Sequence, residues 1–183
     1  IYTRIFYEIV LINEFLRETT DAKLEERGHG DLKEVIKTYR AEARFIRAMS
    51  YWHALDLFAN VPFVTEDDGI GSFFPVQTNS TDLFNFVESE LIEILPNLVD
   101  ARQNEYTRAD KAAAWMVLAK LYLNAEVYIS HPKYSECLTY CNKIIEAGYS
   151  IEERYQDLFC INNEGSDEAI FLIAFDGERT QSW

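Results

Sequence analysis

Two segments of the sequence, 41–54 and 112–125, repeat one pattern of small and aromatic residues 71 positions apart. Alanines that recur at one helical register let a neighbouring helix approach closely. A second amphipathic helical pattern follows each segment, at 81–95 and at 134–146. The pattern therefore predicts two successive helical hairpins packed side by side. The matching pairs are Ala41 with Ala112, Ala43 with Ala114, Ala48 with Ala119, Tyr51 with Tyr122 and Ala54 with Ala125.

Such a tandem of helix-turn-helix units is typical of tetratricopeptide repeats, whose usual period is about 34 residues. In this chain the first unit is lengthened by an inserted loop at 61–79. Insertions in helical repeats map to one face of the array, and that face often binds a ligand or partner. We therefore predict a mainly α fold, an α–α superhelix of tetratricopeptide-like hairpins with a loop on one face.

Further boundaries follow from local signals. Apolar residues at helical spacing predict helices at 2–19 and 32–58, and Pro62 follows the end of the second. A nearly continuous apolar pattern predicts one helix at 109–129 that is covered on almost all sides. The run Thr107-Arg108-Ala109-Asp110 has the Ser/Thr-x-x-acid pattern of a helix start. Gly148 fits a left-handed cap after the helix at 134–146.

The last part of the chain differs in character. Residues 168–175 read Glu-Ala-Ile-Phe-Leu-Ile-Ala-Phe, which predicts a buried strand by length and content. We therefore expect a helical repeat region at 1–151, including the inserted loop 61–79. We expect residues 152–183 to be the start of an irregular, β-containing region that is truncated in this chain.

The charge excludes some classes of protein. The chain has 17 Lys+Arg against 31 Asp+Glu, a net charge of −14 and a pI near 4.6. A protein that tracks nucleic-acid phosphates needs a basic surface, and an acidic one is repelled by anionic membranes. With 48% apolar and 14% aromatic residues the chain is globular rather than disordered. No apolar run approaches the roughly 18 to 20 residues that span a bilayer.

The chain opens Ile1-Tyr2-Thr3 without an initiator Met, a signal peptide or a lipid-attachment Cys, and it stops soon after the predicted strand. We expect it to be an internal piece of a longer protein.

No catalytic set is recognisable. His29, His53 and His131 are scattered, and there is no Gly-x-Ser-x-Gly elbow, phosphate-binding glycine loop or His-Glu-x-x-His pair. The run Glu66-Asp67-Asp68 lacks the alternating ligand spacing of a calcium loop, so we interpret it as a solvated acidic turn. The sequence thus predicts no enzymatic activity and no cofactor.

Three cysteines, Cys137, Cys141 and Cys160, are an odd number, which argues against a disulfide scaffold. Cys137 and Cys141 lie four residues apart on a predicted helix and could form half a metal site, but no second pair has matching spacing. We favour buried, small apolar residues over a metal site.

Exposed aromatic side chains are the remaining signal, because sugar rings stack on their faces. Phe73 and Phe74 in the inserted loop, and Trp183 at the end of the chain, have a context that permits exposure. They are the candidate ligand-binding residues, with core or subunit contact as the favoured alternative. Most other aromatics occupy helical core positions, among them Phe45, Tyr51, Trp52, Trp115 and Tyr122.

Several ordered blocks cover most of the chain. The first block is 40–48, which continues through Tyr51 to Asn60-Val61-Pro62-Phe63. The second is 107–114 with 118–123, the third is 149–151 with 155–159, and the fourth is 162–171. Together they resemble the SusD/RagB family, the surface glycan-binding lipoproteins that Bacteroidetes pair with a TonB-dependent, SusC-like transporter in starch-utilisation-type systems. The chain departs from the family at Ala59, where Gly is frequent, and at Lys120, where Arg is common.

The resemblance implies a non-catalytic helical scaffold at the outer-membrane surface that captures oligosaccharides and delivers them to the transporter. The lipid anchor would lie upstream of these residues, and much of the sugar-binding surface would lie outside them. The matching blocks are packing motifs, so they identify no ligand residue. Arg40, Arg44 and Arg47 are expected to pair with acidic neighbours or cap carbonyls, with contact to the transporter as the alternative.

Two rival functions remain open from the residues alone. A tetratricopeptide-type adaptor would hold a protein partner in its concave groove. A glycoside hydrolase fragment would release sugar, although nothing in the sequence encourages that interpretation.

Overall fold

The computed structural model describes residues 1–69, 71, 74–160, 163–175 and 177–178. Within them the chain is mainly helical, as the sequence predicts. The α-helices are α1 (Tyr2–Glu18), α2 (Asp21–Glu26), α3 (Lys33–Phe58), α4 (Ser80–Ile94), α5 (Lys111–Leu123), α6 (Ala125–Ile129) and α7 (Tyr134–Glu146). Short 3-10 helices lie at Gly30–Leu32, Leu95–Asn97, Tyr155–Phe159 and Asn163–Gly165.

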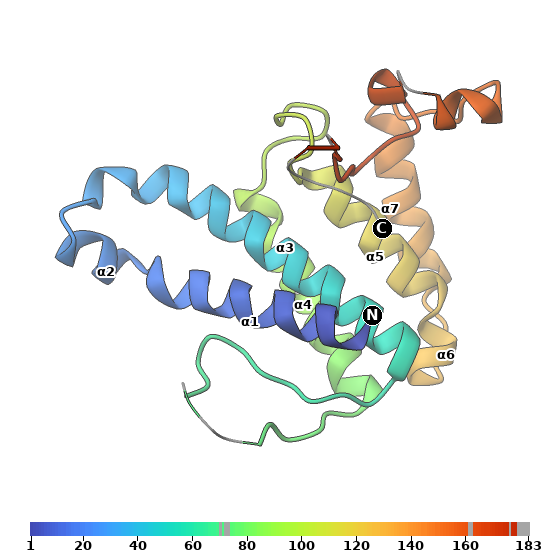
Figure 1. The fold of residues 1–183 in the computed structure, drawn as a ribbon. Helices are drawn as coiled ribbons and strands as arrows, with labels where there is room; N and C mark the ends of the chain where they lie inside the picture. The colour runs from blue at the N-terminus through green and yellow to red at the C-terminus, as the bar shows by residue number, and fades with distance from the viewer. Residues whose placement is uncertain (70, 72–73, 161–162, 176, 179–183) are drawn as a thin grey trace.

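The helices pack as the predicted hairpins. α3 lies against α4, α5 lies against α7, and α1 covers a further side of α3. Figure 1 shows α1 and α3 side by side, with the α5–α7 pair next to them and the inserted loop as a long irregular excursion between α3 and α4. The two hairpins therefore stand next to each other, with the loop at one end of the first.

The repeated small residues form the contacts between these helices. Ala41, Ala48, Ala114 and Ala119 are buried in one hydrophobic cluster with side chains from α1 and α4. Large side chains fill the remaining space, and burying one of them contributes about 1.5–3 kcal/mol. The fully buried large side chains include Phe45, Tyr51, Phe84, Leu91, Leu118 and Leu121.

Two details of the helix at 109–129 differ from the prediction. The segment forms two helices, α5 and α6, with Asn124 between them. The residue that caps α5 is Asp110, whose carboxylate accepts hydrogen bonds from the amides of Ala112 and Ala113 at 2.8 and 3.1 Å. The prediction of a capping box at Thr107 is wrong, because Thr107 has a φ of 69° and belongs to the preceding turn.

The ends of the other helices agree more closely with their sequence signals. Gly148 follows α7 with a φ of 88°, which confirms the left-handed cap. The sequence did not indicate α2, a helix of six residues that Thr20 caps by accepting a hydrogen bond from the amide of Lys23.

The predicted strand at 168–175 is wrong. The segment is irregular, and the side chains of Ile173 and Phe175 are 69% and 57% exposed. A strand needs a neighbouring strand to pair its backbone groups. The described residues contain no named strand, and a single bridge, between Pro62 and Gln77, lies elsewhere. Phe171 instead packs against Phe45 of α3, with ring centres 5.2 Å apart.

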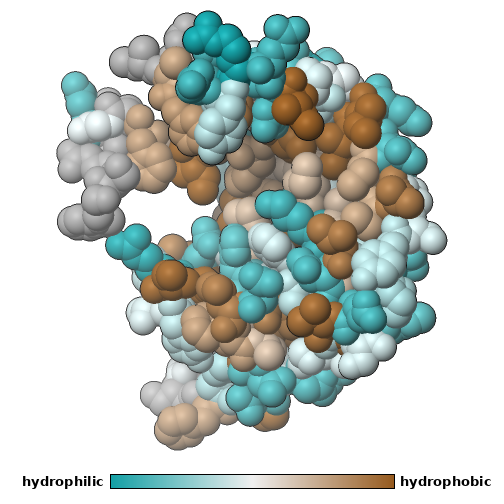
Figure 2. Space-filling view, turned by 90° about the vertical axis from the view of Figure 1, so that its right-hand side faces the viewer, coloured by the Kyte–Doolittle hydropathy of each residue, from teal (hydrophilic) through white to brown (hydrophobic). Residues whose placement is uncertain are grey.

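The outer face of the second hairpin is partly apolar. Figure 2, which views the molecule from the side of α5 to α7, shows hydrophobic side chains among hydrophilic ones. Leu138 and Ile145 of α7, together with Leu123 and Val127, are more than half exposed. Across the residues that the structure describes, no helix is both long and apolar enough to cross a bilayer.

Candidate functional site

The inserted loop 61–79 is the candidate site, because its position on the array is the one where binding faces commonly form. Its two ends are held together by backbone hydrogen bonds. The amide of Phe63 donates to the carbonyl of Val76 at 3.1 Å, and that of Thr78 donates to Val61 at 2.9 Å. The loop therefore leaves and rejoins the helical array at one paired stem.

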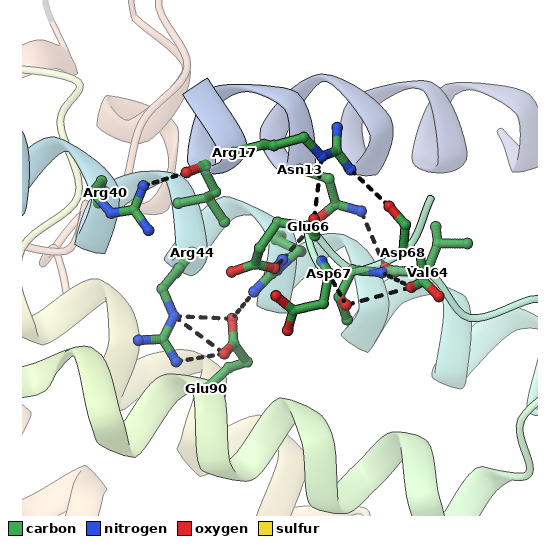
Figure 3. A network of polar contacts seen from close by, with 12 residues as sticks. Asn13, Arg17, Arg40, Arg44, Val64, Glu66, Asp67, Asp68 and Glu90 are labelled. Atoms are coloured by element: carbon green, nitrogen blue, oxygen red, sulfur yellow. Dashed lines mark hydrogen bonds and ion pairs between the residues drawn. The ribbon is translucent and has the colours of Figure 1, made fainter. Parts of the chain in front are cut away.

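Side chains from α1 and α3 bind the backbone of the loop just beyond the stem. The carbonyl of Val64 accepts hydrogen bonds from Asn13 Nδ2 at 3.1 Å and from the Tyr51 hydroxyl at 2.7 Å. The amide of Val64 donates back to the same hydroxyl at 2.9 Å. Arg17 of α1 donates to the carbonyls of Glu66 and Asp68 at 3.2 and 3.3 Å. Figure 3 shows Asn13 and Arg17 reaching from α1 toward this turn.

Arg47 is the central charged side chain beneath the turn. It is only 2% exposed. It donates to Asn13 Oδ1 and to the Glu90 carboxylate, both at 2.7 Å, and it forms an ion pair with Glu66. A buried charge is tolerated only when it is paired and hydrogen-bonded in this way. Arg47 thereby joins the loop to α1, α3 and α4.

The other two arginines also have acidic or carbonyl partners. Arg44 binds Glu90 at 3.1 and 3.2 Å and Glu93 at 2.7 Å, while Arg40 binds the carbonyl of Leu16 and the Thr19 hydroxyl. The predicted pairing of the three arginines is confirmed. Because Arg47 is buried, the alternative of contact with a transporter does not apply to it.

The acidic run in the loop is only partly a solvated turn. Asp67 is exposed, but Glu66 pairs with Arg47, and Asp68 accepts a hydrogen bond from the amide of Thr65 at 2.7 Å. Burial raises the pKa of Glu66, yet the hydrogen bond and charge of Arg47 outweigh it and hold that pKa below its ordinary value. Burial raises the pKa of Tyr51 to about 12, so its hydroxyl remains a donor to Val64.

A hollow lies on each side of the loop. The α1-side hollow, about 470 Å³, is mostly apolar, with Tyr2, Phe6 and Val10 facing Pro62 and Val64. The α4-side hollow, about 580 Å³, is more polar. It is lined by Phe63, Thr65, Asp68, Phe74, Pro75, Val76, Gln77, Thr78, Asn79 and Asp82.

Of the three candidate ligand-binding residues, the structure describes Phe74. Its side chain is 100% exposed and lines the α4-side hollow. Phe73 and Trp183 lie outside the described residues. Phe45, Tyr51 and Tyr122 are buried, as predicted, whereas Trp52 and Trp115 are partly buried. Other exposed aromatic side chains carry no local sequence signal that separates them from core positions. They include Tyr7, Tyr106, Tyr155 and Phe159.

The described residues contain no cluster of three or more His, Cys, Asp or Glu side chains that could hold a metal ion. The three cysteines are free, and Cys137 is buried, which agrees with the apolar interpretation for that residue. Burial raises the pKa of its thiol. Cys141 is partly buried and Cys160 is exposed. His29, His53 and His131 are all exposed and stand on different parts of the array.

The sequence of this chain is similar to those of known proteins. No protein-family model matches the chain. The starch-binding protein SusD of Bacteroides thetaiotaomicron is 35% identical over 190 aligned positions, which cover all of this chain and 32% of that protein. A SusD-like protein, P25, of Formosa agariphila is 30% identical over 138 positions, 74% of this chain and 25% of its own length.

Solved structures share the fold. The surface glycan-binding protein A of Bacteroides uniformis superposes with a TM-score of 0.74 at 22% identity, over 93% of this chain and 36% of that one. A laminarin-binding SusD-like protein superposes with a TM-score of 0.70 at 22% identity, over 93% of this chain and 35% of that one. The fold of this chain is thus the helical fold that these larger proteins share. The chain belongs to the SusD-like family, and it spans about a third of the length of the relatives just named.

Proposed function

We propose that the complete protein captures glycans at the cell surface without catalysis and delivers them to a TonB-dependent transporter in the outer membrane. The observation that supports this most is the 35% identity to a starch-binding protein along the whole of this chain. The names of the structural neighbours point the same way, one with laminarin and another with a xylogluco-oligosaccharide. A lipid anchor upstream of these residues would hold the protein at the membrane.

The geometry of the chain suits a binding role. Recognition without chemistry needs a preformed surface with a few convergent polar groups beside apolar ones. The inserted loop has this composition, and buried side chains of α1 and α3 hold its base in place.

Glycan binding is tested with the complete protein against a defined glycan panel: starch, laminarin and xyloglucan oligosaccharides, followed by other plant, host and microbial polysaccharides. We expect binding to at least one member, measured by affinity electrophoresis and titration calorimetry, with no sugar released. Binding to none would overturn the glycan proposal, and measurable sugar release would indicate a hydrolase.

Delivery is tested separately, by purifying the complete protein from its own membrane. We expect a TonB-dependent transporter to co-purify with it. If the protein were recovered alone under conditions that preserve such complexes, the proposal of delivery to a transporter would be refuted, whereas the proposal of glycan capture would remain.

The rival adaptor function receives less support. In tetratricopeptide adaptors the groove between successive hairpins holds a partner peptide. Here residues 168–171 of the chain itself lie over α3 and α5, and Phe171 packs on Phe45. A partner peptide would have to displace this segment, so we do not favour the adaptor.

A further inference from the structure

The α4-side hollow has the chemistry of a binding site for a sugar ring. Phe74 presents its entire ring to solvent at one wall of the hollow. A pyranose has one apolar face of C–H groups, which packs on an aromatic ring, and hydroxyl groups around its edge. An exposed ring next to polar side chains therefore matches such a ligand better than it matches a purely apolar one.

Polar groups with unused bonding capacity lie on the rim. Asp82 uses Oδ2 to accept from Asn79 Nδ2 at 2.7 Å, and Gln77 uses Nε2 to donate to the carbonyl of Asn60 at 3.2 Å. Among the described residues, Asp82 Oδ1, Gln77 Oε1 and the hydroxyl of Thr78 have no hydrogen-bond partner. These acceptors and this hydroxyl can bind the edge of a sugar.

Hydrogen bonds and an ion pair hold the base of the hollow. Its lining includes Thr65 and Asp68, which belong to the turn after the stem. Arg17 donates a hydrogen bond to the carbonyl of Asp68 in this turn, and Arg47 forms an ion pair with Glu66. On the other side it borders the first turn of α4, where Asn79 accepts from the amide of Asp82 at 2.9 Å. A base that is already held by such contacts loses less conformational entropy when a ligand binds.

The charge of the hollow selects among sugars. Among the residues that the structure describes, its lining contains two carboxylates, Asp68 and Asp82, and no Lys, Arg or His. Carboxylates are good acceptors for hydroxyl groups but repel uronates and sulfated sugars. The net charge of −14 adds to that repulsion at low salt.

From these observations we infer that the α4-side hollow is a subsite for an uncharged pyranose unit, which stacks on Phe74 and hydrogen-bonds to Gln77, Thr78 and Asp82. The inference rests on the proposed glycan-binding function and adds to it a place in the fold and a preference for neutral over anionic glycans.

The test uses the complete protein and whichever neutral glycan of the panel it binds. Phe74→Ala is expected to weaken that affinity about tenfold, and Phe74→Trp to keep or improve it, because the larger ring preserves stacking. Phe159→Ala is the matched control, since Phe159 is 70% exposed but lies outside the loop, and it should leave the affinity within about twofold. Melting curves verify that all three variants are folded.

Polygalacturonate is the anionic probe, and the protein is expected to bind it at least about tenfold more weakly than the neutral glycan at low salt. If the neutral glycan binds and Phe74→Ala has no effect, the subsite is refuted while the proposed function stands. Preferential binding of polygalacturonate would refute the stated preference. If the complete protein binds no glycan, the proposed function fails, and this subsite fails with it.

Discussion

At the scale of single residues, the turn after α3 contains a strained alanine. Ala59 has φ 58° and ψ −70°, and the amide of Asn60 donates to the carbonyl of Phe58 at 2.7 Å. This is a γ-turn with a positive φ at its centre, a conformation that is rare and strained for residues with a Cβ atom. SusD/RagB sequences frequently have glycine at this position, and the observed φ supplies the physical reason.

We expect Ala59→Gly to stabilise the complete protein by about 0.5–1 kcal/mol, because relief of the strain exceeds the entropy that glycine adds to the unfolded state. Urea unfolding measures the change. The control is Ala43→Gly inside α3, which should cost about 1 kcal/mol. A loss of stability in both variants would contradict the strain.

A second residue-scale feature is the hydroxyl of Tyr51, which bonds both the amide and the carbonyl of Val64. Tyr51→Phe leaves the amide without its acceptor and should cost about 1–3 kcal/mol. Hydrogen exchange at Val64 is expected to accelerate. Tyr140→Phe, at a partly buried hydroxyl without a hydrogen bond in the structure, should change stability by less than about 0.5 kcal/mol. Equal effects of the two changes would refute the role of Tyr51.

At the scale of elements, residues 64–68 of the inserted loop are held by charged side chains from three helices, Arg17 of α1, Arg47 of α3 and Glu90 of α4. Glu66 is the member of the network that belongs to the loop itself, and its pKa lies below the ordinary value of 4.5. A carboxylate with a lowered pKa stabilises the folded state above its unfolded pKa, and that contribution is lost as the pH falls through the folded pKa. The anchoring of the loop should therefore weaken only in acid.

We expect hydrogen exchange in residues 64–68, corrected for the intrinsic rate, to increase as the pH falls below about 4.5. In Glu66→Gln the exchange should already be faster at pH 7, and this acid-dependent step should be reduced. Hydrogen exchange in α5 is the control, and it should not show the same increase below about pH 4.5. Loop exchange that is independent of pH in the unsubstituted protein would show that Glu66 does not anchor the loop.

At the scale of the whole molecule, the outer face of α7 exposes apolar side chains. Stacked repeats cover each other's apolar faces, and a terminal unit needs a polar outer face to remain in solution. Leu138 and Ile145 lie on this face, and the relatives are about three times as long as this chain. We therefore expect another part of the complete protein to cover α7.

Leu138→Lys tests this expectation. If the face is covered, a lysine there is buried without a partner, and the complete protein should lose several kcal/mol of stability. Thr139→Lys is the control, because Thr139 is exposed on the same helix but is turned about 100° away from Leu138, and it should have little effect. Unfolding midpoints for the two variants decide the matter, since equal midpoints would mean that α7 faces water.

The sequence by itself determined the helical hairpins, because the signals for them are local. The spacing of Ala41, Ala48, Ala112 and Ala119 defines which faces of α3 and α5 pack, and Gly148 ends α7 by its own backbone freedom. For Phe74 the sequence permitted exposure but favoured core or subunit contact, and the structure shows that the ring is exposed.

Only the tertiary structure decided the features that depend on distant partners. The apolar run 168–175 has the composition of a strand, but no strand lies beside it among the described residues, so Phe171 docks on α3 instead. Glu66 has the sequence context of a solvated turn, but Arg47 stands beneath it because α3 and α4 converge there. The local pattern of apolar residues indicates which secondary structure a segment favours. The partners of its backbone groups and of its buried charges, in contrast, come from residues far away in the chain.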